Sequence, residues 1–379
     1  MNSVLRGLLG SLLGLALGAS GCTPRTAVTA SALASQATGI PSLNWLAEHT
    51  RPAGQSYPQL PDHVRYGSIS GLTFDPQSGQ WIGVIDERDF SRIAWLSITW
   101  EGGQLAVTPT KMLTLSAGPG VSSALVEHAD LEAIVMLPDG SFLLSEEGHR
   151  SKGGVWQPRI LHAQRDGVVS ELIDFPPHFQ LTDDGHGLRD NQGFESLTRT
   201  PGGHLIAGLE QPLIEDGGVT SFVRGGAGRL VEFVPVGSGF RAGREWSYPI
   251  SATQRLPGFE ALCEGGENGL VELLALTETR LLAIERACLQ NAQSGQTANA
   301  ILLFVVELQG KRANKTLLLD LSTLVPRLSP ALAGLENFEA LAFGPRLAVE
   351  GNRRSLLLAS DDNFRKSQKT AFLLFALSE

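Results

Sequence analysis

Four short segments of the chain share one pattern: an apolar residue, a glutamate, a small residue and an aliphatic residue. They are residues 130–134, 193–197, 258–262 and 337–341, and residues 68–72 repeat the pattern with Ser70 in place of the glutamate. Each segment is followed by a turn and a second β-rich run that ends on an acid. The candidate metal ligands are therefore Glu132, Glu195, Glu260 and Glu339 in the first runs, and Asp86, Glu147, Glu210, Glu285 and Asp361 at the ends of the second runs.

Carboxylates that converge in one place repel one another, and their pKa values rise unless a cation or basic side chains neutralise them. A set of oxygen ligands of this kind suits a hard divalent cation, so we predict Ca²⁺ as the cofactor. One alternative stays open, in which each glutamate accepts hydrogen bonds from neighbouring backbone amides and seals one repeat against the next.

Basic residues follow the same runs. Beside a bound cation, Arg and Lys side chains would form an anion site, and phosphate is an anion that uses both. Solvated loop charges are the simpler explanation for any one of these residues taken alone. The candidate catalytic set is Glu195 and Glu260 together with Arg88, Arg150, Arg286 and Lys366.

The repeat also predicts the scaffold that would bring these residues together. Turns rich in Pro and Gly join the two runs in the first three copies, so each unit is expected to be an antiparallel hairpin. The motif positions 70, 132, 195, 260 and 339 are separated by 62, 63, 65 and 79 residues. This spacing suits one four-stranded blade of a β-propeller better than a helical repeat. We predict an all-β chain that forms a single propeller, with five blades readable and a sixth left open.

In a propeller, the first strand of each blade lines the central channel and the second strand runs back beside it. Both sets of acids would therefore gather at one mouth of the channel. Because an unpaired edge strand is unfavourable, a strand from about residue 43 to residue 58 is expected to complete the last blade. Further strands are expected over residues 159–165, 168–175, 300–308, 315–321 and 371–377.

The N-terminal residues have the order of an export signal. Arg6 precedes a short apolar run, and the small residues Ser20 and Gly21 precede Cys22. This ending resembles the lipobox of bacterial lipoproteins, which predicts a signal peptide over residues 1–21 and a lipid on Cys22. A plain cleaved signal with a chance cysteine is the alternative. Either way, we predict an exported protein; with the lipid it would be anchored in the cell envelope, on its periplasmic or extracellular face.

Residues 22–42 have the small, polar composition of a flexible tether, and residues 43–379 are long enough for one large β domain. Without residues 1–21 the chain has 29 basic and 39 acidic residues, a net charge of −10. This charge argues against nucleic acid as a partner. We expect a monomer whose partners are the membrane, through the lipid, and a small anionic substrate.

Cys263 and Cys288 could form a disulfide outside the cytoplasm. If Glu260 and Glu285 faced each other across a hairpin, the two cysteines would be too far apart unless the loop curled back. Both states stay open at this point.

Several segments resemble the family named esterase-like activity of phytase. The most specific match is Asn191-Gln192-Gly193-Phe194-Glu195-Ser196-Leu197, followed by Gly208-Leu209-Glu210-Gln211-Pro212-Leu213, with Ser196 where the family usually has Gly. The resemblance covers about residues 60–379. It implies a propeller with a phosphoesterase or esterase-like activity, and it brings no secure set of catalytic residues.

The leading functional prediction is a metal-dependent phosphoric ester hydrolase that acts at the channel mouth. The carboxylates would hold Ca²⁺, and the basic residues would neutralise the phosphoryl oxygens. One alternative is a non-catalytic envelope propeller that binds a ligand or a protein. Another is a metal-dependent lactonase or carboxylic esterase. The sequence contains no serine-hydrolase elbow, zinc helix or nucleotide-binding loop.

Overall fold

The computed structural model describes residues 39–61 and 64–378. The predicted signal peptide, Cys22 and most of the predicted tether lie outside these described residues. No helix in the described part is long and apolar enough to cross a membrane.

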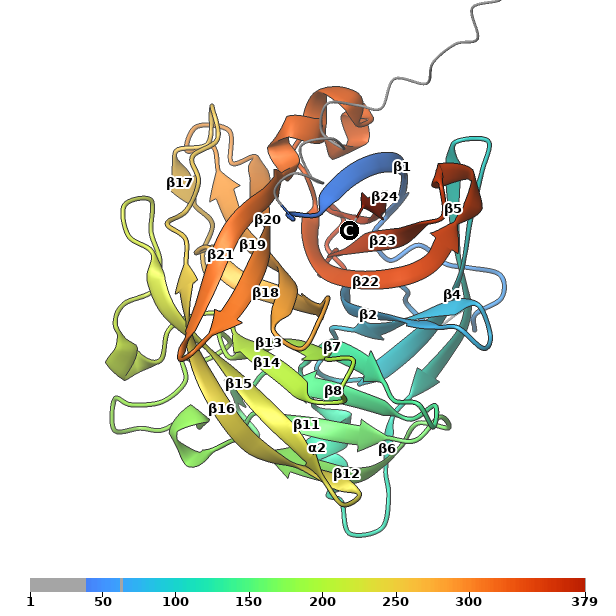
Figure 1. Cartoon of the computed structure of the whole chain (residues 1–379). Helices are drawn as coiled ribbons and strands as arrows, with labels where there is room; N and C mark the ends of the chain where they lie inside the picture. Colours follow the sequence, from blue (N-terminus) through green and yellow to red (C-terminus); the bar gives the residue numbers. More distant parts are fainter. Residues whose placement is uncertain (1–38, 62–63, 379) are drawn as a thin grey trace, which may run out of the picture.

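β-Strands dominate the described chain, and they form five units of four antiparallel strands around a common axis (Figure 1). The first unit contains β2 (Ile69–Asp75), β3 (Gln80–Ile85), β4 (Arg92–Glu101) and β5 (Gln104–Thr114). The second contains β7 (Leu131–Met136), β8 (Phe142–Glu146), β11 (Arg159–Ala163) and β12 (Val168–Asp174), with β6 (Ser116–Ala117) at its outer edge. The third contains β13 (Phe194–Arg199), β14 (Leu205–Leu209), β15 (Gly226–Val236) and β16 (Gly239–Ile250).

The fourth unit contains β18 (Gly269–Ala275), β19 (Arg280–Gln290), β20 (Thr297–Gln309) and β21 (Arg312–Asp320), with β17 (Ala261–Leu262) beside the end of β19. The fifth contains β22 (Asn337–Leu347), β23 (Arg353–Asp361), β24 (Lys369–Ser378) and β1 (Ser42–Pro52). A single parallel pair, Ser247 with Arg312, joins the outer strands of the third and fourth units.

Short elements connect these strands. A hairpin of β9 (His149–Ser151) and β10 (Gly154–Trp156) projects from the second unit. The helical elements of the described chain are α2 (Ser123–Glu127), η1 (Pro177–Phe179), η2 (Ile214–Asp216), η3 (Leu321–Arg327), η4 (Pro330–Leu332) and η5 (Ala348–Glu350).

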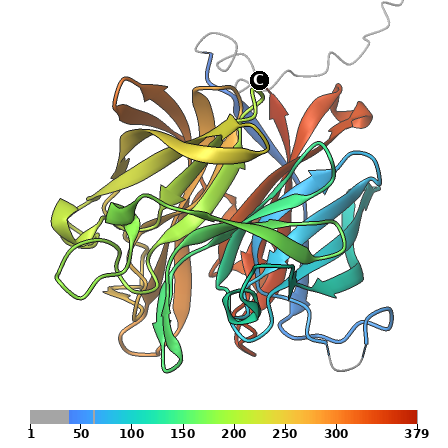
Figure 2. The ribbon, with the colours of Figure 1, turned by 90° about the horizontal axis from the view of Figure 1, so that it is seen from below.

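The innermost strands β2, β7, β13, β18 and β22 contact one another in a closed ring, and the sheets stand side by side around it (Figures 1 and 2). Apolar clusters fill the five spaces between neighbouring units. Examples are Leu303 with Leu358 between the fourth and fifth units, and Phe179 with Phe194 between the second and third. The fold is therefore a β-propeller, as the repeat predicts.

Strand β1 closes the ring. It pairs antiparallel with β24, from Ser42 opposite Ser378 to Pro52 opposite Lys369. The predicted closing strand is confirmed, although it ends at Pro52 and not near residue 58. The other predicted strands are confirmed with shifts of up to three residues at their ends.

The fourth copy of the motif was placed wrongly. Residues 258–262 do not form an innermost strand, because Pro257 and Gly258 make a turn that is closed by the N–H of Phe259 donating to the carbonyl of Leu256 (3.1 Å). The innermost strand of the fourth unit is β18, an apolar run that carries no glutamate at the motif position.

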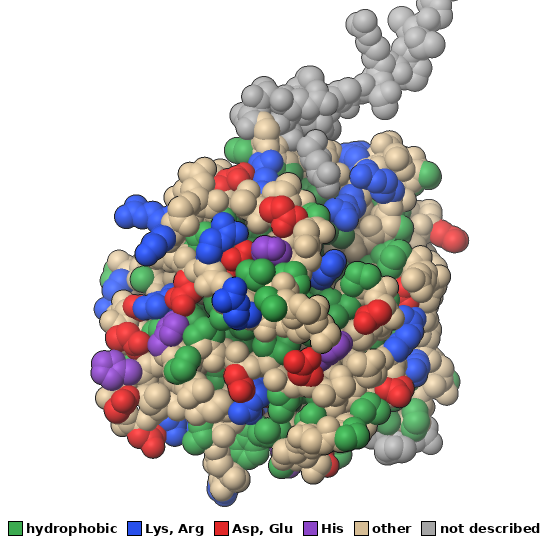
Figure 3. Space-filling view, turned by 60° about the horizontal axis from the view of Figure 1, so that its bottom comes forward, with side chains coloured by type: hydrophobic (Ala, Val, Ile, Leu, Met, Phe, Trp, Pro, Cys, Tyr) green, Lys and Arg blue, Asp and Glu red, His purple; other side chains and the backbone are tan. Residues whose placement is uncertain are grey.

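Figure 3 shows one face of the molecule, on which acidic and basic side chains are interspersed. Neither positive nor negative side chains dominate this face.

The pairing of β1 with β24 can be tested with an engineered disulfide. Cysteines introduced at Ser42 and Ser378 should form a disulfide spontaneously, because residues directly opposite in an antiparallel pair have Cα atoms about 4.5–5.5 Å apart. The bond should raise the free energy of unfolding by at most about 5 kcal/mol. Mass spectrometry and denaturant unfolding would measure both effects. The pair Ser42→Cys with Thr370→Cys, at opposite ends of the same two strands, is the control; bond formation in the control alone would contradict the register.

Candidate functional site

Each innermost strand carries a β-bulge near its first residue, and the motif glutamates are the bulged residues. The pairing skips Glu132 in β7, Glu195 in β13 and Glu339 in β22. A bulge leaves its residue out of the hydrogen-bond ladder and changes the direction of its side chain. The repeated pattern thus encodes a repeated local geometry. The same bulge falls on Ser70 in β2 and on Val271 in β18.

A second set of residues lies beside the bulges, where the second strand of each unit ends. The backbone N–H groups of Asp86, Glu147 and Glu210 donate to the carbonyls of Ser68, Asp130 and Gly193, at 2.8–3.0 Å. Asp361 pairs with Asn337 in the fifth unit. In the fourth unit the corresponding residue is Arg286, which pairs with Gly269.

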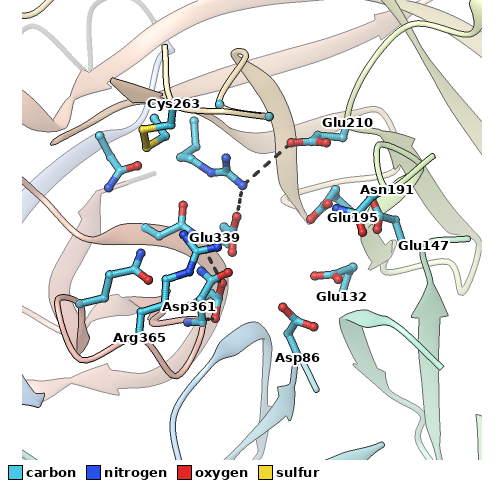
Figure 4. Close-up of a pocket in the computed structure, with 18 of the residues that line it drawn as sticks. Asp86, Glu132, Glu147, Asn191, Glu195, Glu210, Cys263, Glu339, Asp361 and Arg365 are labelled. Carbon is cyan, nitrogen blue, oxygen red and sulfur yellow. Dashed lines mark hydrogen bonds and ion pairs between the residues drawn. A yellow bond between two sulfur atoms is a disulfide. The ribbon is translucent and has the colours of Figure 1, made fainter. Parts of the chain in front are cut away.

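These side chains line one cavity of about 490 Å³ (Figure 4). Its wall contains the acids of the bulges and strand ends of four units: Asp86, Glu132, Glu147, Glu195, Glu210, Glu339 and Asp361. Glu264, in the loop before β18, also lines it. It also contains the guanidinium groups of Arg88, Arg286 and Arg365 and the amides of Asn191, Asn299, Asn337, Asn363 and Gln368. The predicted meeting of both acid sets at one channel mouth is present in the geometry.

The acids of the first three units form a tight cluster. Carboxylate oxygens of Asp86, Asp130 and Glu132 lie within 4.8 Å of one another, and so do those of Glu132, Glu147 and Glu195. Burial and the neighbouring carboxylates raise the pKa values of Glu132, Glu147 and Glu195 well above the usual range. The same two effects raise the pKa of Asp86.

Arg286 neutralises part of the other side of the cavity. Its Nη2 pairs with Glu339 and lies 3.9 Å from Oε1 of Glu210. Burial still raises the pKa values of Glu210 and Glu339 to about 7, against the opposing effect of Arg286. The acids in turn raise the pKa of Arg286, which therefore remains charged.

The most specific motif has a glycine at position 193 because the backbone of Glu147 approaches it closely. A Cβ atom there would lie 2.1 Å from the carbonyl oxygen of Glu147. The close approach lets the Gly193 N–H donate to Oε1 of Glu147 (3.1 Å), which fixes that carboxylate beside the bulge of β13.

Two predicted acids lie elsewhere. Glu260 is exposed after the Pro257–Gly258 turn and does not line the cavity. Glu285 precedes Arg286 on β19, and successive side chains of a strand point to opposite faces. It is therefore buried between the third and fourth units, where it accepts from Tyr248 Oη (2.9 Å) and pairs with Lys315.

The predicted basic residues divide in the same way. Arg88 and Arg286 line the cavity, and Nε of Arg88 lies 2.7 Å from Oδ2 of Asp130. Arg150 pairs instead with Asp183 (2.9 Å) and donates to the Thr182 carbonyl (2.8 Å). Lys366 is exposed and outside the cavity wall, which its neighbour Arg365 reaches.

Asp130 is the main residue that the sequence prediction missed. It stands two positions before Glu132, inside the motif, and only 1% of its surface is exposed. An acid at this position occurs in one copy alone, so the repeat gave no signal for it.

Cys263 and Cys288 are joined by a disulfide, with Cα atoms 5.4 Å apart. The distance argument against this bond was wrong because its premise, Glu260 facing Glu285, is not met. The loop before β18 curls back along the end of β19, and the Cys263 N–H donates to the Cys288 carbonyl (3.0 Å). The disulfide lines the cavity.

The raised pKa values predict how stability depends on pH when no cation is bound. Glu210 and Glu339 keep their protons up to about pH 7 in the folded protein, whereas their ordinary pKa is 4.5. Between these pH values the native state binds more protons than the unfolded chain. The free energy of unfolding should therefore fall as pH rises from about 4.5 to 7, by about 1.4 kcal/mol per pH unit for each such carboxyl.

Denaturant unfolding in the presence of chelator would measure this slope. Glu210→Gln should reduce it, whereas Glu101→Gln, at an exposed turn, should not. A stability that rises over the same range would contradict the burial of these groups.

Comparison with known proteins gives one family. The family model described as esterase-like activity of phytase, Phytase-like, matches residues 64–364. A comparison with curated proteins found no match. Among solved structures, the endo-arabinase from Bacteroides thetaiotaomicron VPI-5482 is similar at 9% identity and a TM-score of 0.43, over 89% of this chain and 98% of that one.

The RS223 β-xylosidase is similar at 7% identity and a TM-score of 0.41, over 87% of this chain and 95% of that one. A putative gluconolactonase is similar at 13% identity and a TM-score of 0.34, over 89% and 92%. The family match runs from before β2 to the loop after β23, without β1 and β24, and the chain belongs to the family of proteins described as having the esterase-like activity of phytase.

Proposed function

We propose that the protein is a cation-dependent phosphoric ester hydrolase whose active site is the carboxylate cavity. The proposal rests on how charges are distributed in this cavity, with acids in one part of the wall and guanidinium groups in another. Four acids of the cluster have no ion pair to a basic side chain among the described residues: Asp86, Glu132, Glu147 and Glu195. The fifth, Asp130, is paired with Arg88, while Arg286 and Arg365 lie in the same wall. An unneutralised acid cluster beside guanidinium groups suits a cation and an anion bound together.

The residues fit a hard divalent cation. All donors of the cluster are carboxylate oxygens, the type of ligand that Ca²⁺ prefers. Oδ1 of Asp130 is buried without a hydrogen-bond partner in the described structure. Buried carboxylates at this spacing repel one another unless protons or a cation are bound, so a cation would relieve the repulsion.

When bound, the cation would supply positive charge that polarises the phosphoryl group and acidifies water. Glu195 would accept a proton from the attacking water. The water oxygen would bond to phosphorus as the ester P–O bond breaks, giving an alcohol and inorganic phosphate. Arg365, which has no ion-pair partner among the described residues, would offset charge on the phosphoryl oxygens. Arg286 would hold Glu210 and Glu339 in place, and Arg88 would hold Asp130.

Calcium should both stabilise the fold and support hydrolysis of p-nitrophenyl phosphate. At 100 times its dissociation constant, a ligand bound only by the native state adds about 2.7 kcal/mol to the free energy of unfolding. Glu195→Gln keeps the shape but removes a charge, so it should weaken the calcium-induced rise in melting temperature and lower kcat about 100-fold or more.

Glu260→Gln is the matched control, because the same substitution there changes an exposed acid outside the cavity. It should behave as the unaltered protein in both measurements. Melting curves that do not depend on calcium in any of the three proteins would refute the cation site. Calcium-dependent melting without hydrolysis would favour a binding propeller, and hydrolysis of lactones or carboxylic esters alone would favour the other esterase class.

We also propose that the protein is exported and held in the cell envelope by a lipid on Cys22. The first described residues show where such an anchor would join the ring. The described chain begins near the turn of β18 and β19, where Nη2 of Arg280 donates to the Gly39 carbonyl (2.5 Å), and β1 starts opposite the C-terminal Ser378. Both points lie at the end of the sheets away from Asp361 and Arg286, so the anchor would join the ring at the end opposite the cavity.

Replacing Cys22 by Ser should release the protein from membranes or leave its signal segment attached. Thr26→Ser, four residues further on, should not change membrane association. Fractionation and mass spectrometry of the N-terminus would measure both variants. Membrane association that survives Cys22→Ser with the signal removed would refute the lipid anchor.

A further inference from the structure

The carboxylate cavity does not end at the acids. A second cavity of about 530 Å³ lies between the fourth and fifth units, and its wall shares Cys263, Glu264, Cys288, Asn299, Arg365 and Gln368 with the first. The two cavities therefore adjoin. We call the second one the groove; the disulfide lies in the wall that it shares with the first.

The chemistry of the groove differs from that of the acid cluster. The residues found only in the groove wall are Gln290, Thr297 and Ser367, which are neutral hydrogen-bonding side chains. Its charged residues are Glu264 and Arg365, one of each sign, and both are exposed. No large apolar side chain is among its lining residues.

One buried atom of the shared wall lacks a partner. Oε1 of Gln368 is inaccessible to solvent and accepts no hydrogen bond from the described residues. A buried acceptor without a donor is unfavourable, and a ligand hydroxyl would satisfy it. Nearby, Nδ2 of Asn299 donates to the Leu335 carbonyl (3.1 Å), which fixes the side chain that lies at the junction of the two cavities.

We propose that this groove binds the alcohol part of the substrate, and that this alcohol is neutral and rich in hydroxyl groups, as a sugar or polyol is. The inference rests on the proposed hydrolase for the position of the phosphate. The phosphate would lie at the acid cluster and its cation, and the alcohol would extend over the disulfide between the fourth and fifth units.

The charges of the wall limit the substrate to a single phosphate. Arg88 is already paired with Asp130, and Arg286 with Glu339. Arg365 is the remaining guanidinium of the wall, and it has no ion-pair partner among the described residues. Additional phosphates would meet Glu264 and the acid cluster with one cationic side chain to offset them, which is unfavourable.

Binding of non-hydrolysable phosphonates tests the groove without depending on catalysis. In calcium, the methylene-phosphonate analogue of glucose 6-phosphate should bind about tenfold more tightly than methylphosphonate, as one or two added hydrogen bonds would give. Thr297→Trp should fill the groove, and Gln368→Met should remove the unpartnered acceptor. Both should bring the ratio of the two dissociation constants near one. Thr297→Trp, which lies outside the wall of the carboxylate cavity, should leave the methylphosphonate constant unchanged.

Ser238→Trp is the matched control, because this exposed residue lies in the β15–β16 turn at the opposite end of the sheets. It should keep the ratio of the unaltered protein. Calorimetric titration measures the constants, and a retained calcium-induced rise in melting temperature shows that each variant is folded.

The outcomes separate the two proposals. Equal binding of the two phosphonates, or a ratio that survives Thr297→Trp, would overturn the groove, whether or not p-nitrophenyl phosphate is hydrolysed. Tighter binding of inositol hexakisphosphate than of the glucose analogue would overturn the limit to one phosphate. A groove-dependent ratio without hydrolysis of either glucose 6-phosphate or p-nitrophenyl phosphate would support the groove and refute the hydrolase.

Discussion

Repulsion between buried carboxylates is the interaction on which the cavity depends. The closed ring brings the bulges of β7, β13 and β22 to one mouth, and the acids at the ends of the second strands lie beside them. Burial leaves these groups two ways to lower their energy: they take up protons, or they take up a cation. The five apolar clusters between the units hold the ring against this repulsion.

The fourth unit departs from the pattern of the other units, and this departure puts a positive charge on one side of the cavity. Val271 replaces the motif glutamate, and Arg286 replaces the acid at the end of the second strand. A ring with acids in all five units would repel anions from every side. With Arg286 in one unit, Glu210 and Glu339 near it are partly neutralised. Asp86, Glu132 and Glu147 have no ion pair to a basic side chain among the described residues. The cation cluster and the anion-binding side chains then occupy different parts of one wall.

Much of the ring could be predicted from the sequence because the hairpins repeat in sequence and in length. The fourth motif misled the prediction, since Gly258-Phe259-Glu260-Ala261-Leu262 matches the pattern while Pro257 and Gly258 turn the chain out of the sheet. The register error also assigned Glu285 to the cavity. Along a strand, a shift of one residue moves a side chain to the other face, and no local feature distinguished Glu285 from Arg286. Asp130 and the disulfide depend on contacts between distant segments, which the repeat does not encode.

The pairing of β1 with β24 determines when the ring can close during synthesis. Of the described strands β1 is synthesised first, and its partner β24 follows only after the strands of all the other units. The fifth sheet therefore lacks this pairing until β24 has been made, and β1 side chains that pack in the closed ring, such as Ala47, have no partner strand before then. Contacts of such high sequence separation form slowly. The ring therefore cannot close while its first four units are being made, and the strand that begins it must wait for the strand that completes it.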